Sequence, residues 1–194
     1  MLKKVVLAMS GLLSLLACET LPSDVVEAYL AATRDGDLAT LAKVSVVGWP
    51  GERHQASDIE AWWVTQVTTS QVEPFQLEER QRRLNAARAA RDARMKETGE
   101  GEDTELQRIQ SRVARLRVVV ERERDEASKS VETWAPIDGL QGDVEIRQVE
   151  VIVRSPSGDQ RYALTLKRYR LSRSPNESQT PSRWIVTAIE FVDG

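Results

Sequence analysis

The sequence predicts an α+β fold, in which helices come first and a strongly curved antiparallel sheet follows. Two observations carry this prediction. Apolar residues recur with helical spacing in the first part of the chain, and two long runs near the end are rich in β-branched and aromatic residues. A third observation, a block of charged residues between these parts, indicates how the 194-residue chain is organised.

The chain begins with a short basic stretch that contains Lys3 and Lys4, followed by an uncharged run over residues 5–17. A basic start, an apolar run and a small residue at its end are typical of a secretory signal peptide. Thirteen residues in a helix reach about 20 Å, which is less than the roughly 30 Å of a hydrocarbon core. A permanent transmembrane helix is therefore the weaker interpretation, and residues 1–17 are predicted to be a signal peptide.

The end of this run, Leu15-Leu16-Ala17-Cys18, resembles the lipobox of bacterial lipoproteins. The resemblance implies cleavage before Cys18, diacylglycerol on its sulfur and a further acyl chain, such as palmitate, on the new amino terminus. Two or more acyl chains hold a protein stably on a membrane, so residues 18–23 are predicted to be a lipidated N-terminus and a short tether. The alternative is a buried free thiol. Glu19 in place of aspartate favours, by the same resemblance, the outer membrane facing the periplasm in a Gram-negative cell.

Composition narrows the possible functions. Without residues 1–17 the formal charge changes from −3 to −5, and an acidic protein is a poor candidate for binding nucleic acid. Cys18 is the only cysteine, so no disulfide is expected. His54 is the only histidine and has no second histidine or neighbouring cysteine beside it, so we expect no zinc site. We expect neither a metal nor a cofactor.

Residues 24–75 are predicted to be the helical half of the domain. Asp24 and Glu27 have the spacing of a capping box, Gly36 suits a helix end, and Asp37 can cap a second helix. The residues expected to face inward are Val26, Tyr29, Leu30 and Thr33 of the first helix and Leu38, Leu41 and Ala42 of the second.

A third helix is predicted over residues 58–67, because Ser57 and Glu60 form a second capping-box pattern. Trp62 and Trp63 fall within it. As adjacent residues they cannot share one helix face fully, so one is expected in the core and the other at a rim or surface.

Residues 76–130 are predicted to form a charged antiparallel helical hairpin. The sequence is rich in good helix formers, and Gly99 and Gly101 break it before Asp103, a candidate cap. The second arm has the a/d spacing of a coiled coil at Leu106, Ile109, Val113, Leu116 and Val120. The first arm has a thinner seam at Leu77, Leu84, Ala87 and Met95. Arginine and glutamate nearly balance, which is typical of a solvated surface.

Residues 131–194 are predicted to be the curved sheet. Strands are expected over residues 144–153 and 161–171, joined by a turn, with a first strand over 130–135 and a last strand over 183–191. In both long strands the apolar alternation shifts by one residue, from Ile146 to Val149 and from Leu166 to Tyr169. Such a shift predicts a β-bulge, which would bend the sheet.

Three helices followed by a curved meander resemble the NTF2-like, cone-shaped α+β fold. The resemblance lies in "VVEAYLAATRDGDLATLAKV" near the start and "RWIVTAIEF" near the end, and it covers residues 24–70 and 131–192, with the hairpin inserted between. That superfamily includes ketosteroid isomerases, and Tyr29 falls where they carry a catalytic tyrosine. Residues 44–50, where their carboxylate base would follow, contain no acid, so we do not expect an enzyme.

The sequence leaves two non-enzymatic functions open. The first is a membrane-anchored cell-envelope adaptor that binds a protein partner, or a second copy, through an exposed hairpin seam. In the alternative arrangement, the two helices of the hairpin bury the seam against each other and leave it unavailable to a partner. The second function is binding of a small apolar ligand in the cone, in a pocket lined by Tyr29, Trp49, Trp62, Trp63, Tyr169 and Trp184.

Overall fold

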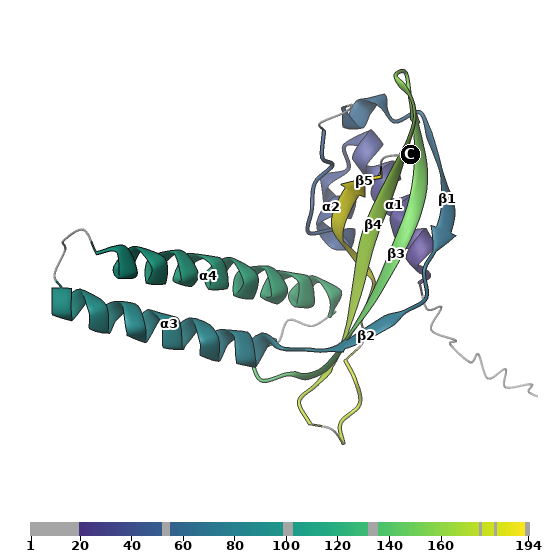
Figure 1. Cartoon of the computed structure of the whole chain (residues 1–194). Helices are drawn as coiled ribbons and strands as arrows, with labels where there is room; N and C mark the ends of the chain where they lie inside the picture. The colour runs from purple at the N-terminus through teal and green to yellow at the C-terminus, as the bar shows by residue number, and fades with distance from the viewer. Residues whose placement is uncertain are drawn as a thin grey trace, which may run out of the picture.

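The structure is a computed structural model that describes residues 20–51, 55–98, 103–131, 136–174, 176–180 and 182–192. Cys18, the predicted signal peptide and His54 lie outside these residues. The described chain has an α+β fold with four α-helices and a five-stranded antiparallel sheet (Figure 1). The helices are α1 (Pro22–Asp35), α2 (Leu38–Val44), α3 (Leu77–Thr98) and α4 (Thr104–Ser130), with a short 3-10 helix, η1 (Ala56–Asp58). The strands are β1 (Ala61–Val67), β2 (Gln71–Pro74), β3 (Gln141–Ser155), β4 (Gly158–Ser172) and β5 (Ile185–Phe191).

The first two helices form where predicted, but the predicted Asp24–Glu27 capping box is wrong: Leu21 is the N-cap of α1, and Asp24 in the first turn accepts the backbone N–H of Leu21 at 3.3 Å. α1 starts at Pro22, slightly before the predicted cap, because proline has no N–H to satisfy at this position. Gly36 ends it in the left-handed conformation with φ 69°, and the Asp37 side chain caps α2 by accepting two backbone N–H groups. The predicted inward positions of Leu38 and Ala42 are wrong, because α2 lies at the surface and leaves both side chains exposed, that of Leu38 by 77%.

The predicted third helix over residues 58–67 is wrong, so residues 24–75 are not wholly helical. Local capping is confined to η1, where Asp58 accepts the backbone N–H of Gln55 at 3.1 Å. Residues 61–67 instead form β1, which pairs antiparallel with β3. This segment is rich in aromatic and β-branched residues, whose preference for strands prevails when a partner strand is available. Trp62 and Trp63 therefore point to opposite faces of the sheet.

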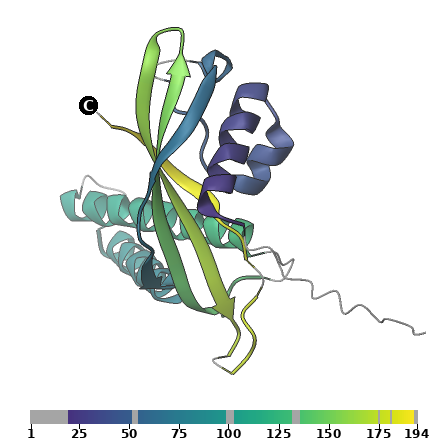
Figure 2. The same ribbon diagram turned by 90° about the vertical axis from the view of Figure 1, so that its right-hand side faces the viewer.

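A long β-ribbon made of β3 and β4 is the centre of the fold. The strands pair from Gln141 with Ser172 to Ser155 with Gly158, and no register shift interrupts them. The sheet order is β1-β3-β4-β5, and β2 pairs with β3 on the same side as β1. Helices α1 and α2 lie against one face of the ribbon, whereas α3 and α4 meet it near its other end (Figures 1 and 2).

The shift in apolar alternation along β3 and β4 is not the predicted β-bulge. Toward the turn, the buried residues face α1, namely Val149, Val151 and Val153 with Tyr162, Leu164 and Leu166. Toward the other end, the buried residues lie on the opposite face and pack with α3 and α4, namely Val144, Tyr169 and Leu171. The alternation therefore changes phase because different helices cover the two halves of the ribbon, each on its own face. Register shifts occur instead where β1 pairs with β3 and where β4 pairs with β5.

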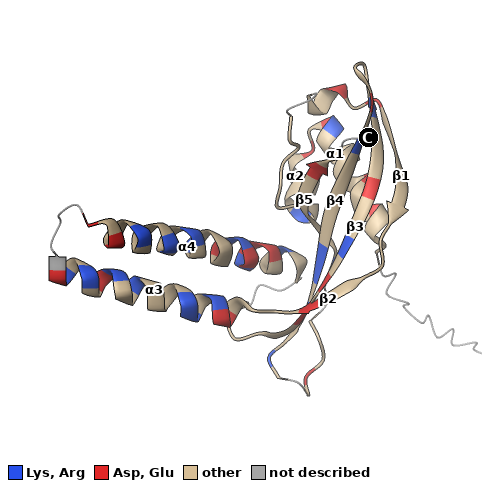
Figure 3. Ribbon diagram, viewed as in Figure 1, with Lys and Arg blue, Asp and Glu red and all other residues tan. Residues whose placement is uncertain are grey.

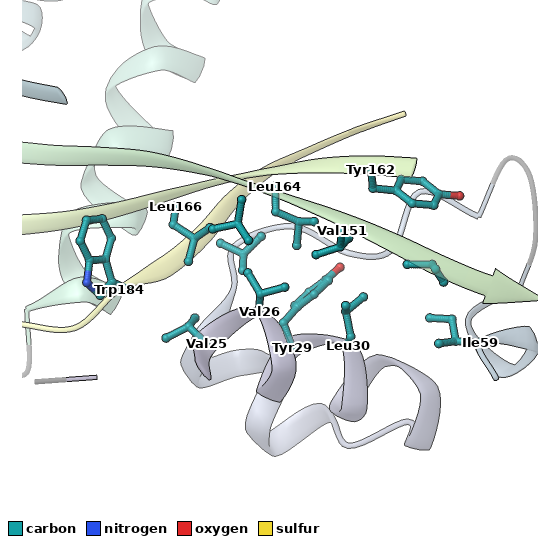
Figure 4. Packing of buried hydrophobic residues seen from close by; sticks show 13 residues of the cluster. Val25, Val26, Tyr29, Leu30, Ile59, Val151, Tyr162, Leu164, Leu166 and Trp184 are labelled. Atoms are coloured by element: carbon teal, nitrogen blue, oxygen red, sulfur yellow. The ribbon is translucent and has the colours of Figure 1, made fainter. Parts of the chain in front are cut away.

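The core under α1 is filled by side chains. Val26, Tyr29 and Leu30 have no exposed surface, as their spacing predicts, and they pack against the apolar residues of β3 and β4 (Figure 4). At the start of α1, Val25 belongs to the same cluster as Trp184 (Figure 4). The predicted inward face of the first helix is confirmed.

Helices α3 and α4 run side by side in opposite directions and project from the sheet as one arm (Figure 1). With 22 and 27 residues, they are about 33 and 40 Å long. Asp103 caps α4, as predicted, by accepting the backbone N–H of Glu105 at 2.9 Å. Met95 is 40% exposed, so its predicted place in the seam of α3 is wrong, whereas the other three seam residues of α3 are buried.

The predicted first strand over residues 130–135 is absent from its described part. Ser130 is the last residue of α4, and Val131 forms a single antiparallel bridge with Ser182. Residues 132–135 lie outside the described residues. The helix continues further than predicted because its last turn packs on the sheet, where Ala127 and Ser130 are completely buried.

Candidate functional site

The base of the arm holds a buried carboxylate that joins α4 to β4. Glu126 is 1% exposed. Its Oε2 accepts the Tyr169 hydroxyl and the Lys167 ammonium, each at 2.7 Å, and its Oε1 accepts Arg122 Nε at 2.9 Å. Burial alone would raise the pKa of Glu126, but the hydrogen bonds from Lys167 and Tyr169 outweigh burial and hold the pKa below its ordinary value. The carboxylate therefore remains charged and links the arm to the sheet.

Further hydrogen bonds fix the end of α4 to the neighbouring strands. The Ser130 hydroxyl donates to the carbonyl of Arg183 at 2.7 Å and accepts the backbone N–H of Tyr169 at 3.0 Å. Arg122 Nη2 donates to the carbonyl of Thr187 on β5 at 2.7 Å. Each buried polar group of this set has a partner, so the direction of the arm relative to the sheet is strongly specified.

A cleft of about 370 Å³ opens where the arm meets the sheet. Its walls come from α4, the first turn of α3 and strands β2 to β5. Its charged lining residues are three acids, Glu73, Glu123 and Glu126, and three bases, Arg80, Arg122 and Lys167. Apolar side chains, among them Val119, Val144 and Ile146, line the rest. A cleft with this lining can receive a side chain that has both polar and apolar parts.

Glu123 is a buried carboxylate of the cleft that, within the described part of the chain, lacks a hydrogen bond to one of its oxygens. It is 7% exposed, and its Oε2 accepts no hydrogen bond from the described residues, although Arg80 Nε lies 3.3 Å away. Burial raises the pKa of this carboxyl above its ordinary value. Within the described residues, no group of three histidine, cysteine, aspartate or glutamate side chains could hold a metal ion.

A second buried carboxylate, Glu145, lies on the opposite face of the sheet. It accepts the Ser70 hydroxyl at 2.6 Å, and Nη2 groups of Arg168 and Arg170 at 2.6 and 2.8 Å. Burial opposes the charged form, but these hydrogen bonds prevail and lower the pKa of Glu145 to about 2. The guanidinium of Arg168 also lies 4.7 Å from the ring centroid of Trp184, which fixes this tryptophan in place.

The predicted seam residues of α4 face α3. Leu106, Val113 and Val120 are buried, and Ile109 and Leu116 are partly buried in the same cluster as Leu84 and Ala87 of α3. The two helices thus bury the seam against each other, which is the second of the two arrangements that the sequence allows. A partner that binds the arm must use another of its surfaces.

The six aromatic residues expected to line an apolar pocket do not share one site. Tyr29 and Trp184 are buried in the cluster under α1, and Trp49 and Trp62 pack at its edge. Trp49 lies against Tyr162, with ring centroids 4.9 Å apart. These contacts are those of core residues.

The other two aromatic residues lie on the opposite face of the sheet. Trp63 is 38% exposed, and the guanidinium of Arg154 stacks on it at 5.2 Å. Tyr169 belongs to the arm base and contacts Phe75 edge to face at 5.7 Å. The sheet therefore separates these residues from Tyr29.

Sequence reasoning missed the buried acids of the arm base, although a signal was present. The a/d spacing of the seam continues past Val120 to Glu123 and Ala127. A glutamate at a seam position predicts either a buried charge with partners or the end of the seam. In the structure Glu123 is buried beside Arg80 without a hydrogen bond at Oε2 from any described residue, whereas the fully hydrogen-bonded carboxylate is Glu126, which lies outside the seam positions.

Comparisons with protein-family models, with characterised proteins and with solved structures gave no match. Among the described residues, no helix combines the length and the apolar character needed to cross a bilayer.

Proposed function

We propose that this protein is a non-enzymatic, lipid-anchored cell-envelope protein that binds a protein partner through the arm formed by α3 and α4. In this proposal the sheet with α1 and α2 is an NTF2-like domain, the arm is an insertion in it, and Cys18 carries the lipid. The observation that supports it most is the arm itself, whose helices of about 33 and 40 Å touch the sheet only near their base (Figure 1).

The geometry of the arm favours a role in binding over that of an insertion without a function. Its seam is buried, so the arm holds its shape without a partner. Its base is fixed through Glu126 and Ser130, so the arm points in one direction. A preorganised surface loses little conformational entropy on binding, which favours affinity.

Binding of an apolar ligand in the cone has less support. The space between α1 and the sheet is occupied by side chains, among them Tyr29, Leu30 and Leu164, which have no exposed surface. A ligand there would have to displace a packed core. We therefore keep the arm as the proposed site.

The test is photo-cross-linking in native membranes, which compares the full chain with a variant whose residues 76–130 are replaced by a short Gly-Ser turn. A cross-linker at Arg88, exposed on α3, reports on the arm of the intact protein, and one at Arg161, exposed on β4, reports on the sheet in both. Circular dichroism must first show that the shortened chain folds. We expect a specific partner at position 88, and we expect the shortened chain to lose this partner from co-purification. Partners that are unchanged by shortening would refute the proposal.

The lipid anchor is tested separately with Cys18→Ala. The full chain should incorporate labelled palmitate and sediment with membranes, whereas the variant should do neither. A variant that still incorporates the label would refute lipidation at Cys18.

A further inference from the structure

The arm has a small excess of basic residues, since residues 76–130 contain 14 arginines and lysines and 12 aspartates and glutamates, and the two kinds are unevenly distributed along it. Residues 80–91 of α3 and 106–120 of α4 contain nine arginines and no acidic residue. The acids of the two helices lie toward the tip and the base (Figure 3). The middle of the arm is therefore a basic band, on a chain whose formal net charge is −3. Five of the nine arginines lie in ion pairs with the flanking acids, namely Arg80, Arg83, Arg91, Arg108 and Arg117.

On α4 the basic residues form a stripe along one face. Arg108, Arg112 and Arg115 are separated by steps of four and three residues, which places them one above the other. All three are exposed. Arg112 and Arg115 form no ion pair with any residue that the structure describes, and Arg108 has only Glu105, at 3.5 Å. These guanidinium groups are available to a partner.

The same stripe leads into the cleft at the arm base. Further steps of four and three residues reach Val119 and Arg122, both of which line the cleft. Val118 and Val119 are 63% and 40% exposed, so apolar surface lies beside the guanidinium groups. From Arg108 to Arg122 the stripe is about 21 Å long, equal to four turns of helix.

We propose that this stripe is the docking surface of the arm, and that its partner is an acidic amphipathic helix of another protein. This inference rests on the proposed function and names the chemistry of the partner. Carboxylates placed every three or four residues along the partner helix would form ion pairs with Arg108, Arg112 and Arg115, because arginine binds carboxylates in a bidentate geometry. An apolar residue of the partner would lie on Val118 and Val119. A phosphate chain or a lipid headgroup has no apolar side chain at these intervals, so the surface favours a polypeptide.

The test uses the purified full chain in detergent and a fluorescent peptide as the probe. The peptide is an 18-residue helix with glutamate at every third or fourth position and leucine along one edge, and the control peptide has the same composition in scrambled order. The test variant is R108Q/R112Q/R115Q. The matched control, K43Q/R161Q/R173Q, removes the same charge from exposed residues outside the arm.

We expect the helical peptide to bind more tightly than the scrambled one. The test variant should weaken binding about tenfold, since three exposed ion pairs are lost, and the control variant should change it less than twofold. Binding should also weaken as salt is raised from 50 to 200 mM. Equal losses in both variants, or no binding of the helical peptide, would overturn the inference. Stripe-dependent binding to phosphatidylglycerol vesicles without peptide binding would also overturn it and assign the stripe to the membrane.

The inference and the proposed function can fail separately. If shortening the arm removes the cellular partner but R108Q/R112Q/R115Q retains it, the arm binds a protein through another surface and the stripe assignment is wrong. If shortening the arm leaves all partners in place, the proposed function itself fails.

Discussion

Three buried tyrosines of this protein differ in the hydrogen-bond acceptors of their hydroxyl groups. The Tyr169 hydroxyl donates to the charged carboxylate of Glu126 at 2.7 Å, and the Tyr162 hydroxyl donates to the neutral amide oxygen of Gln160 at 2.9 Å. The Tyr29 hydroxyl makes no hydrogen bond of standard geometry among the described residues; burial raises its pKa to about 12, and the nearby Thr33 side chain opposes this rise. Replacing each tyrosine with phenylalanine removes one hydroxyl and little else, so the series isolates the hydrogen bond.

The expected losses follow from the acceptors. A hydrogen bond to a charged group contributes about 2 kcal/mol and one between neutral groups about 1 kcal/mol. For a chain of this size, Tyr169→Phe should lower Tm by about 4–8 °C and Tyr162→Phe by about half of that. Tyr29→Phe should leave the free energy of unfolding unchanged or raise it, because a buried hydroxyl without a partner carries an uncompensated cost of desolvation.

Thermal and urea unfolding of the full chain at pH 7 measure all three variants against the wild type. The m-value should stay constant, which shows that the variants unfold from the same compact state. The reasoning is refuted if Tyr29→Phe destabilises as much as Tyr169→Phe. In that case the Tyr29 hydroxyl has a partner, and a polar role for it under α1 would have to be reconsidered.

Three further predictions concern the seam, the ribbon and pH. Val120→Ala, in the buried seam, should lower the free energy of unfolding measured in urea by about 2 kcal/mol. Val118→Ala, on the exposed face, should change it by less than about 0.5 kcal/mol. Similar values for the two variants would mean that the seam is not packed. Gly142→Ala should cost more than about 2 kcal/mol, because φ is +145° and a Cβ would lie 2.1 Å from the carbonyl oxygen of Arg170; a wild-type Tm would disprove this close approach. The pKa of Glu145 falls from 4.5 to about 2 on folding, so its stabilisation of about 3 kcal/mol is complete above pH 4.5 and is lost as pH falls toward 2. Unfolding between pH 6 and 2.5 should therefore be less pH-dependent in Glu145→Gln than in the wild type, and equal slopes would contradict the shift.

The parts of the fold that the sequence predicts correctly are those with local causes. Gly36 and Asp37 end one helix and start the next through their own backbone and side-chain chemistry, which a single sequence displays. The seam of α4 is likewise visible as a period, and the structure buries it. These signals need no knowledge of distant residues.

The errors have non-local causes. The capping pattern of Ser57 and Glu60 predicts a helix, but residues 61–67 become a strand because β3, about 90 residues later, offers an open edge. The apparent bulge in the long strands is a change of the covering helix, which depends on where α1 and the arm pack. Two partners of Glu126, Lys167 and Tyr169, come from β4, some 40 residues away, so no local pattern contains them.

The reversal of polarity along β3 and β4 also protects the pairing of these strands. In a ribbon with one covered face, a slip by one residue exposes a single set of apolar side chains. Here the same slip would turn Val151 away from α1 and Val144 away from the arm at once, and it would bring charged residues under both sets of helices. Each half of the ribbon thus penalises a misalignment of the other half, so a hairpin of two 15-residue strands without an internal bulge can hold a single register along its whole length.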